Sequence, residues 1–139
     1  MLPFVGAWTE MMVSISVASS LPAAAAVPAV PVVIGKVGPE LDACSSTGQV
    51  SGINSKAKEP WLNVRNAPRM DGKILGKLKP GALVTMCDTS SDGQWEAVVY
   101  SDQPDADCGT ASPVDRPRAY KGPCKSGWVA SRFIVPIAG

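Results

Sequence analysis

The chain contains no histidine among its 139 residues, and histidine is the usual base that activates a serine or cysteine nucleophile. The cysteine–histidine pair of a cysteine peptidase is therefore excluded. A glycosidase would need two facing carboxylates, but the acidic residues cluster in predicted turns and in one long loop. The sequence therefore predicts a protein that is not an enzyme, and no cofactor is expected.

Closely spaced cysteine pairs are also missing. The chain has four cysteines, and none of them forms a C-x-x-C pair, which is the spacing that structural zinc sites commonly use. We therefore expect no metal. An even number of cysteines in a small chain suggests two disulfides, provided that the chain is exported, as its N-terminal residues indicate below. Of the three possible pairings we favour Cys108 with Cys124, which closes a local loop, and Cys44 with Cys87, which crosses the core.

Charged residues are absent from Met11 to Gly35, a stretch that is rich in alanine and interrupted by prolines. We interpret residues 1–26 as a signal peptide with an A-x-A cleavage site ending at Ala26, which implies a secreted or periplasmic protein. The first ten residues contain no lysine or arginine, which is unusual for such a signal. An uncleaved anchor and a disordered cytosolic tail are the alternatives.

Strong net charge is lacking as well. After cleavage at Ala26 the chain would keep 13 basic and 11 acidic residues, a net charge of 13 − 11 = +2. Nucleic-acid binding usually needs a strongly basic face, so nucleic acid is not the expected partner. We expect a monomer with no stable membrane insertion after processing.

Helical periodicity is absent downstream of the predicted signal, and short alternating segments take its place. Residues 27–47 are rich in valine, proline and glycine and are interpreted as an extended linker, so that the domain spans residues 48–139. Strands are predicted at 49–53, 62–65, 74–78, 83–87, 94–100, 127–129 and 134–137, and a single turn at 130–133. The predicted fold class is all-β.

Residues 101–126 form a long segment with four prolines and two cysteines. A loop of this length in a small domain is usually functional or held in place by cross-links. Its acidic residues come first and its basic residues follow, so that the two arms of the loop can attract each other. The spacing of the acidic residues does not fit a dedicated calcium loop.

The order of short motifs resembles the bacterial SH3-like domain family. The resemblance rests on Leu62-Asn63-Val64-Arg65 with Pro68, on Ile74-Leu75-Gly76, on Trp95, and on Gly127-Trp128-Val129 followed by Phe133-Ile134. It implies a small, partly open β-barrel of about five to six strands. Two features depart from the family pattern: the insertion at 101–126 before the closing strand, and the four cysteines.

The aromatic and basic residues near the predicted strand edges are the candidate ligand-binding residues: Trp61, Arg65, Tyr100, Arg116 and Tyr120. Each also has a simpler structural role. Arg65 is more simply interpreted as a residue that braces a loop, and Tyr120 either folds back as a plug or is presented to a partner. Trp95 and Trp128 are expected in the core.

The resemblance implies a non-catalytic binding module of the bacterial cell envelope that recognises a peptide of peptidoglycan or another extended peptide. The expected partner is therefore peptidoglycan or an envelope protein. The alternative is a secreted or periplasmic interaction or inhibitor protein that uses the 101–126 loop, because a cross-linked loop on a rigid scaffold presents a preorganised surface.

Overall fold

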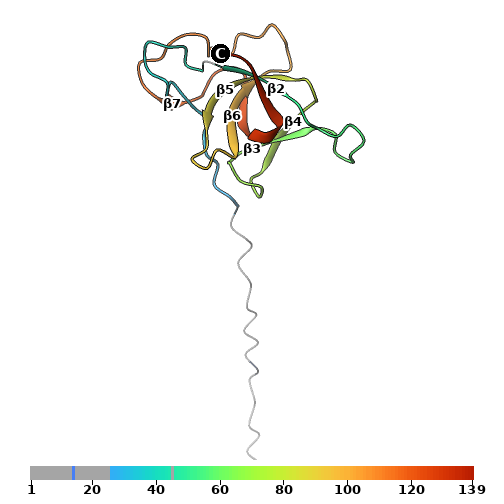
Figure 1. Ribbon diagram of the computed structural model, residues 1–139. Coiled ribbons are helices and arrows are strands. Elements are labelled where there is room, and N and C mark those ends of the chain that lie inside the picture. Colours follow the sequence, from blue (N-terminus) through green and yellow to red (C-terminus); the bar gives the residue numbers. More distant parts are fainter. Residues whose placement is uncertain (1–13, 15–25, 45) are drawn as a thin grey trace, which may run out of the picture.

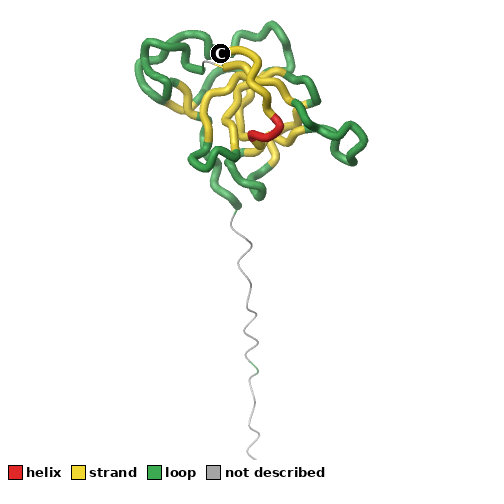
Figure 2. The backbone as a smooth tube through the Cα atoms, in the orientation of Figure 1, coloured by secondary structure: helices red, strands yellow, loops and turns green. Residues whose placement is uncertain are grey.

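The computed structural model describes Ser14, residues 26–44 and residues 46–139 (Figures 1 and 2). The predicted signal peptide thus lies outside the described residues, except for Ser14 and Ala26. The strands are β1 (Val33–Ile34), β2 (Ser46–Val50), β3 (Leu62–Arg65), β4 (Ile74–Leu78), β5 (Leu83–Thr89), β6 (Trp95–Tyr100), β7 (Arg118–Ala119), β8 (Lys125–Ala130) and β9 (Ile134–Ala138), with one 3-10 turn, η1 (Ser131–Phe133).

Seven of these strands form one antiparallel sheet in the order β4-β3-β8-β6-β5-β2-β9, and the sheet curves strongly around its inner face (Figure 1). In the part of the chain that the structure describes, the end strands β4 and β9 do not pair, so no closed barrel forms. The all-β prediction is confirmed. The sheet exceeds the expected five or six strands because the C-terminal segment adds β9 beside β2.

The inner face of the sheet carries a cluster of buried side chains that follows directly from strand alternation. In β3, Leu62 and Val64 point inward while their neighbours are only partly buried. This inner cluster comprises Val50, Leu62, Val64, Leu78, Val84, Val98, Tyr100, Val129 and Ile134. The sequence motifs around Arg65 and Gly127 lie next to each other in the sheet, because β3 pairs with β8. A Cβ on Gly127 would lie 2.9 Å from the Arg65 carbonyl oxygen, so glycine at this position lets β8 approach β3 closely.

The outer face of the same sheet carries a second cluster. Strand β6 is buried along its whole length, because its residues alternate between the two faces. Its odd-numbered residues join the outer cluster, which comprises Val32, Ile34, Ala43, Cys44, Cys87, Trp95, Ala97, Val99, Val114 and Trp128. The sheet is therefore covered on its outer side by a layer drawn from the N-terminal segment and the 101–126 insertion.

Residues 30–44 are part of the domain, which corrects the linker predicted for residues 27–47. The Trp128 indole N–H donates to the Val30 carbonyl oxygen at 2.9 Å, and the Tyr120 amide donates to the Val32 carbonyl oxygen at 2.7 Å. Further along, the Cys44 amide donates to the Thr110 carbonyl oxygen at 3.2 Å, and β1 pairs with β7. The segment has no periodicity because its hydrogen-bond partners are divided between the insertion, Trp128 of β8 and Asn66, so that it does not pair as a strand of the large sheet.

The first predicted strand is displaced from residues 49–53 to Ser46–Val50. Gly52 adopts a φ of +76°, a left-handed conformation that ends the strand and that glycine adopts without steric cost. The following loop, up to the start of β3, extends away from the body of the domain (Figure 1).

Candidate functional site

A groove of about 560 Å³ lies between the sheet and the first arm of the insertion, residues 101–108. One wall is formed by the end of β4, the β4–β5 turn and the start of β5, and the opposite wall by the arm. Leu83, Ala82 and Pro104 supply apolar surface, and Lys77 and Lys79 supply the basic groups. A groove of this size with mixed lining suits part of a peptide better than a small metal ion.

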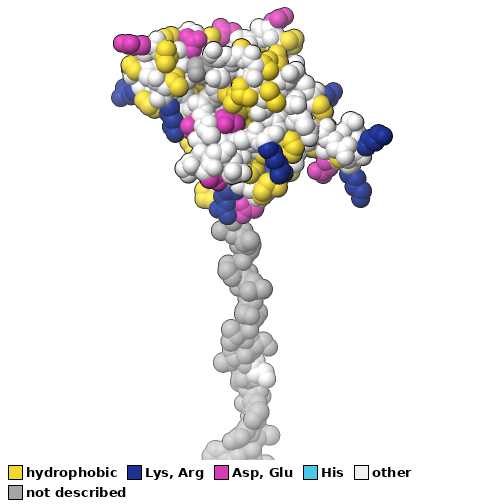
Figure 3. All heavy atoms as spheres, viewed as in Figure 1, with side chains coloured by type: hydrophobic (Ala, Val, Ile, Leu, Met, Phe, Trp, Pro, Cys, Tyr) yellow, Lys and Arg dark blue, Asp and Glu magenta, His cyan; other side chains and the backbone are white. Residues whose placement is uncertain are grey.

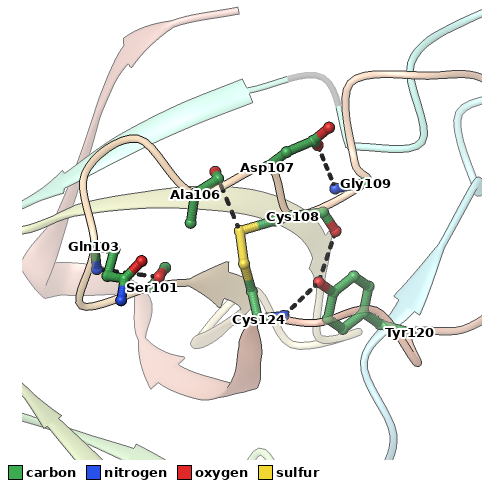
Figure 4. Close-up of a disulfide and its surroundings, with 8 residues drawn as sticks. All are labelled: Ser101, Gln103, Ala106, Asp107, Cys108, Gly109, Tyr120 and Cys124. Carbon is green, nitrogen blue, oxygen red and sulfur yellow. Dashed lines mark hydrogen bonds between the residues drawn. A yellow bond between two sulfur atoms is a disulfide. The ribbon is translucent and has the colours of Figure 1, made fainter.

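The arm is held by the Cys108–Cys124 disulfide and by the Tyr120 side chain (Figure 4). The Tyr120 hydroxyl donates to the Cys108 carbonyl oxygen at 2.7 Å and accepts from the Cys124 amide at 3.1 Å. Both predicted disulfides, Cys44–Cys87 and Cys108–Cys124, are confirmed. The wall of the groove is thus fixed by a covalent bond and by a hydroxyl that bridges the same two residues.

A smaller groove of about 330 Å³ lies on the other side of the arm and shares Ser101, Asp102, Gln103 and Ala106 with the first. Its charges compensate each other in part, because Lys125 Nζ lies 2.8 Å from an Asp102 carboxylate oxygen. The hydrogen bond to Asp102 raises the pKa of Lys125. The arm therefore separates two grooves, of which the larger carries uncompensated basic groups.

Exposed apolar side chains extend from the larger groove toward the edge of the sheet. Leu83 is paired across the sheet with Gln49, and Gln49 with Val135, so the three side chains form a row on one face. Leu83 is 56% exposed and Val135 48% exposed, and Figure 3 shows hydrophobic side chains gathered near the C-terminal strand. Pro136 in β9 lacks an amide hydrogen, which limits the addition of a further strand at this edge.

Of the five candidate ligand-binding residues, only Tyr100 lines the larger groove. Its ring is buried in the inner cluster, and its hydroxyl faces Gly76: a Cβ at position 76 would lie 2.6 Å from that oxygen. Burial raises the pKa of Tyr100, and the nearby charge of Lys125 opposes this shift. The hydroxyl is therefore protonated at neutral pH, and Gly76 provides the space that it occupies.

Trp61 lies next to the groove but does not line it. Its ring is covered by the Lys77 ammonium group, which sits 4.2 Å from the ring centroid. The indole nitrogen of Trp61 and the Oδ1 of Asn63 are buried without a hydrogen-bond partner among the described residues. Trp61 thus positions a residue of the groove instead of forming its surface.

The other three candidates lie apart from the larger groove and do not line the smaller one. Arg65 donates to the Gly72 carbonyl oxygen at 2.9 Å and braces the β3–β4 turn. Arg116 is exposed on the far arm of the insertion, close to Gly35. Tyr120 folds back between the two cysteines and holds the arm in place.

Glu96 is a buried carboxyl group that lies outside both grooves. It is 9% exposed and accepts a hydrogen bond from the Thr89 hydroxyl at 3.0 Å. Burial raises the pKa of Glu96; the Thr89 hydrogen bond opposes the shift, and the charge of Asp88 adds to it. Asp88 in turn forms an ion pair with Lys36 at 2.8 Å, which joins β5 to the N-terminal segment.

Metal-binding clusters and membrane-spanning helices are both missing from the part of the chain that the structure describes. Among Ser14, 26–44 and 46–139, no group of three or more histidine, cysteine, aspartate or glutamate side chains could hold a metal ion. No helix within those ranges is long and apolar enough to cross a membrane.

The fold and the groove define a small all-β protein whose larger groove has one wall fixed by a disulfide. Comparison of the chain with protein-family models, with curated proteins and with solved structures finds no match.

The residues of the groove that sequence reasoning missed are Lys77, Lys79 and Leu83. The sequence shows the Lys79-Pro80-Gly81 turn and the alternation of β4 and β5, but it does not show that the 101–108 arm lies opposite them. That arrangement depends on contacts between segments far apart in the chain, so a lysine at the end of a strand carries no distinguishing signal.

Proposed function

We propose that this protein is a non-catalytic binding module of the bacterial cell envelope, related to the SH3-like family, that holds an extended peptide of peptidoglycan. The observation that carries the proposal is the larger groove, whose two walls are a rigid sheet and an arm fixed by a disulfide. Such preorganisation lowers the entropy lost when a flexible peptide binds. The ordered motifs around Val64, Gly76 and Gly127 support the family assignment.

The two intramolecular disulfides are typical of proteins that fold in the periplasm or outside the cell. This agrees with a secreted or periplasmic location, in which peptidoglycan is accessible. The absence of histidine from the whole chain supports a role in binding, since no imidazole base is available for hydrolysis.

Co-sedimentation of the purified protein with isolated peptidoglycan tests the proposal. Leu83→Glu places a charge on the groove wall and is expected to reduce the bound fraction by roughly tenfold, because it adds a charge where apolar contact is needed. Val135→Glu is the matched control, since Val135 is similarly exposed on the same sheet but does not line the groove. Val135→Glu is expected to bind as the unchanged protein does.

The alternative, an interaction or inhibitor protein that uses the 101–126 loop, predicts a different pattern. Arg116 and Arg118 are exposed on the second arm, away from the groove. Arg116→Glu with Arg118→Glu would then abolish binding to an envelope protein, while Leu83→Glu would leave it intact. If the unchanged protein does not sediment with peptidoglycan at all, the proposed function is wrong.

A further inference from the structure

The larger groove has a positive charge that the described residues do not neutralise. Lys77 and Lys79 both line it and are exposed, and neither belongs to the ion pairs found among the described residues. The acidic residue of the lining is Asp102, whose carboxylate is already paired with Lys125. Because Leu78 between the two lysines points into the inner cluster, both lysines project to the same, outer side of β4.

The position of Lys77 is fixed without loss of its charge. Its ammonium group lies over the Trp61 ring at 4.2 Å from the centroid, in a cation–π contact. Unlike an ion pair, this contact leaves the full positive charge available to a ligand. Lys77 is therefore ordered at the groove before a ligand arrives.

Tyr100 lines the same groove from the inner side of the sheet. The Tyr100 hydroxyl takes part in none of the side-chain hydrogen bonds found among the described residues, although Tyr100 lines the groove. Gly76 leaves space for this oxygen, because any larger residue there would bring its Cβ to 2.6 Å from it. Gly76 lies on the same side of β4 as Leu78, so this hydroxyl lies on the inner side and away from the two ammonium groups. The two ammonium groups by themselves form a donor set that matches a carboxylate, which only accepts hydrogen bonds.

We propose that Lys77 and Lys79 bind a free carboxylate of the peptidoglycan peptide, while the peptide's apolar part lies on Leu83, Ala82 and Pro104. This inference rests on the proposed function and adds the chemical group that the groove recognises. Charge complementarity selects this occupant, since a neutral or basic peptide would leave the two ammonium groups without a counter-charge.

The test compares native peptidoglycan with the same material after its carboxyl groups have been converted to amides by carbodiimide and ammonia. The unchanged protein is expected to bind the amidated material about tenfold more weakly, because each partly exposed charge pair contributes roughly threefold in affinity. Lys77→Gln with Lys79→Gln is expected to bind native material about tenfold more weakly, with little further loss on amidated material. That lack of additivity is the signature of a direct contact.

The matched control is Lys56→Gln with Lys58→Gln, which removes the same charge from the exposed loop between β2 and β3. It is expected to bind both materials as the unchanged protein does. Lys79→Gln alone keeps the Trp61 contact intact and should lose roughly threefold.

The outcomes separate the two proposals. Equal binding of native and amidated peptidoglycan by the unchanged protein would overturn the carboxylate inference and leave the proposed function standing. An equal loss in the Lys56 and Lys58 control would also overturn it, because it would show general charge attraction. Absence of binding to native peptidoglycan would overturn the proposed function itself.

Discussion

The two faces of the sheet are built in different ways. The inner cluster is formed mainly by strand residues, and its members follow from alternation within each strand. The outer cluster joins the other face of β6 and β8 to two irregular segments, residues 30–44 and 101–126. Those segments contain few buried apolar residues, so burial alone cannot offset the entropy lost on ordering them. On this side, backbone hydrogen bonds outside the large sheet and both disulfides help to offset that loss.

The difference shows that the outer layer depends on covalent links in a way that the inner cluster does not. Cys44–Cys87 ties the N-terminal segment to β5, and both residues are buried in the outer cluster. Cys108–Cys124 closes the insertion on itself and borders the two grooves. One disulfide therefore holds the layer on the sheet, and the other fixes the arm that borders the two grooves.

Removal of the disulfides gives the largest expected effects. Cys44→Ala with Cys87→Ala opens a loop with a sequence separation of 43 residues and is expected to lower the free energy of unfolding by about 4 kcal/mol. Cys108→Ala with Cys124→Ala opens a loop with a sequence separation of 16 residues and is expected to lower the free energy of unfolding by about 3 kcal/mol. Urea unfolding measures both changes.

Amide hydrogen exchange sharpens this prediction. In the variant with Cys44→Ala and Cys87→Ala, the amides of residue 44 and Tyr120, which bond across the outer layer, should lose protection before those of β3. Simultaneous loss of protection in both regions would show that the two clusters unfold as one unit. The conclusion that the outer layer depends on the disulfides for its stability, while the inner cluster does not, would then be wrong.

The inner cluster is well predicted from the sequence, because period-two alternation in β3, β5 and β6 is a local signal. A single turn is predicted at 130–133, and the structure has it at Ser131–Phe133; both disulfides are predicted as well. The outer layer has no such signal. Residues 30–44 resemble a linker because valine and proline without periodicity give no indication of a partner, and that partner is the equally irregular 101–126 insertion.

The groove is predictable only in outline. Tyr100 is one of the aromatic residues that the sequence singles out, and it lines the groove, whereas Trp61 lies beside it. Arg65 can be interpreted either way, and its bond to the Gly72 carbonyl oxygen gives it a structural role. Lys77 and Lys79 escape prediction because their partner wall, the 101–108 arm, is placed by the Cys108–Cys124 disulfide and not by local sequence.

A matched pair of valine substitutions compares the packing of the two clusters. Val64 in the inner cluster is fully buried, and Val114 in the outer cluster is 8% exposed. Val64→Ala is expected to lower the free energy of unfolding by about 2–3 kcal/mol, because closely packed strands cannot collapse into the cavity. Val114→Ala should cost about 1 kcal/mol, since an irregular loop can relax. Equal losses in urea unfolding would show that the outer layer is packed as rigidly as the sheet.

The smallest expected effect concerns Glu96, which is buried in β6 beside Thr89. Because burial raises the pKa of Glu96 above 4.5 in the folded protein, the folded state retains the proton longer than the unfolded state does. The stability that this group contributes is therefore complete below pH 4.5 and is lost as the pH rises through the raised pKa. The stability contributed by Asp92 depends on pH in the opposite direction. Hydrogen bonding from Ser90 lowers the pKa of Asp92, so that contribution is lost only when the pH falls below 3.8.

Glu96→Gln isolates this contribution. The Thr89 hydroxyl can still donate to the amide oxygen, and no charge develops in the buried position. We expect the variant to match the unchanged protein near pH 4 and to unfold at a higher urea concentration at pH 7, with Glu59→Gln in the exposed β2–β3 loop as the control. A variant that is less stable at pH 7 would mean that the ionised carboxylate stabilises the fold. The Asp88–Lys36 pair, which joins the outer layer to β5, would then be the first cause to test, because Lys36 pairs with the Asp88 charge that helps to raise the pKa of Glu96.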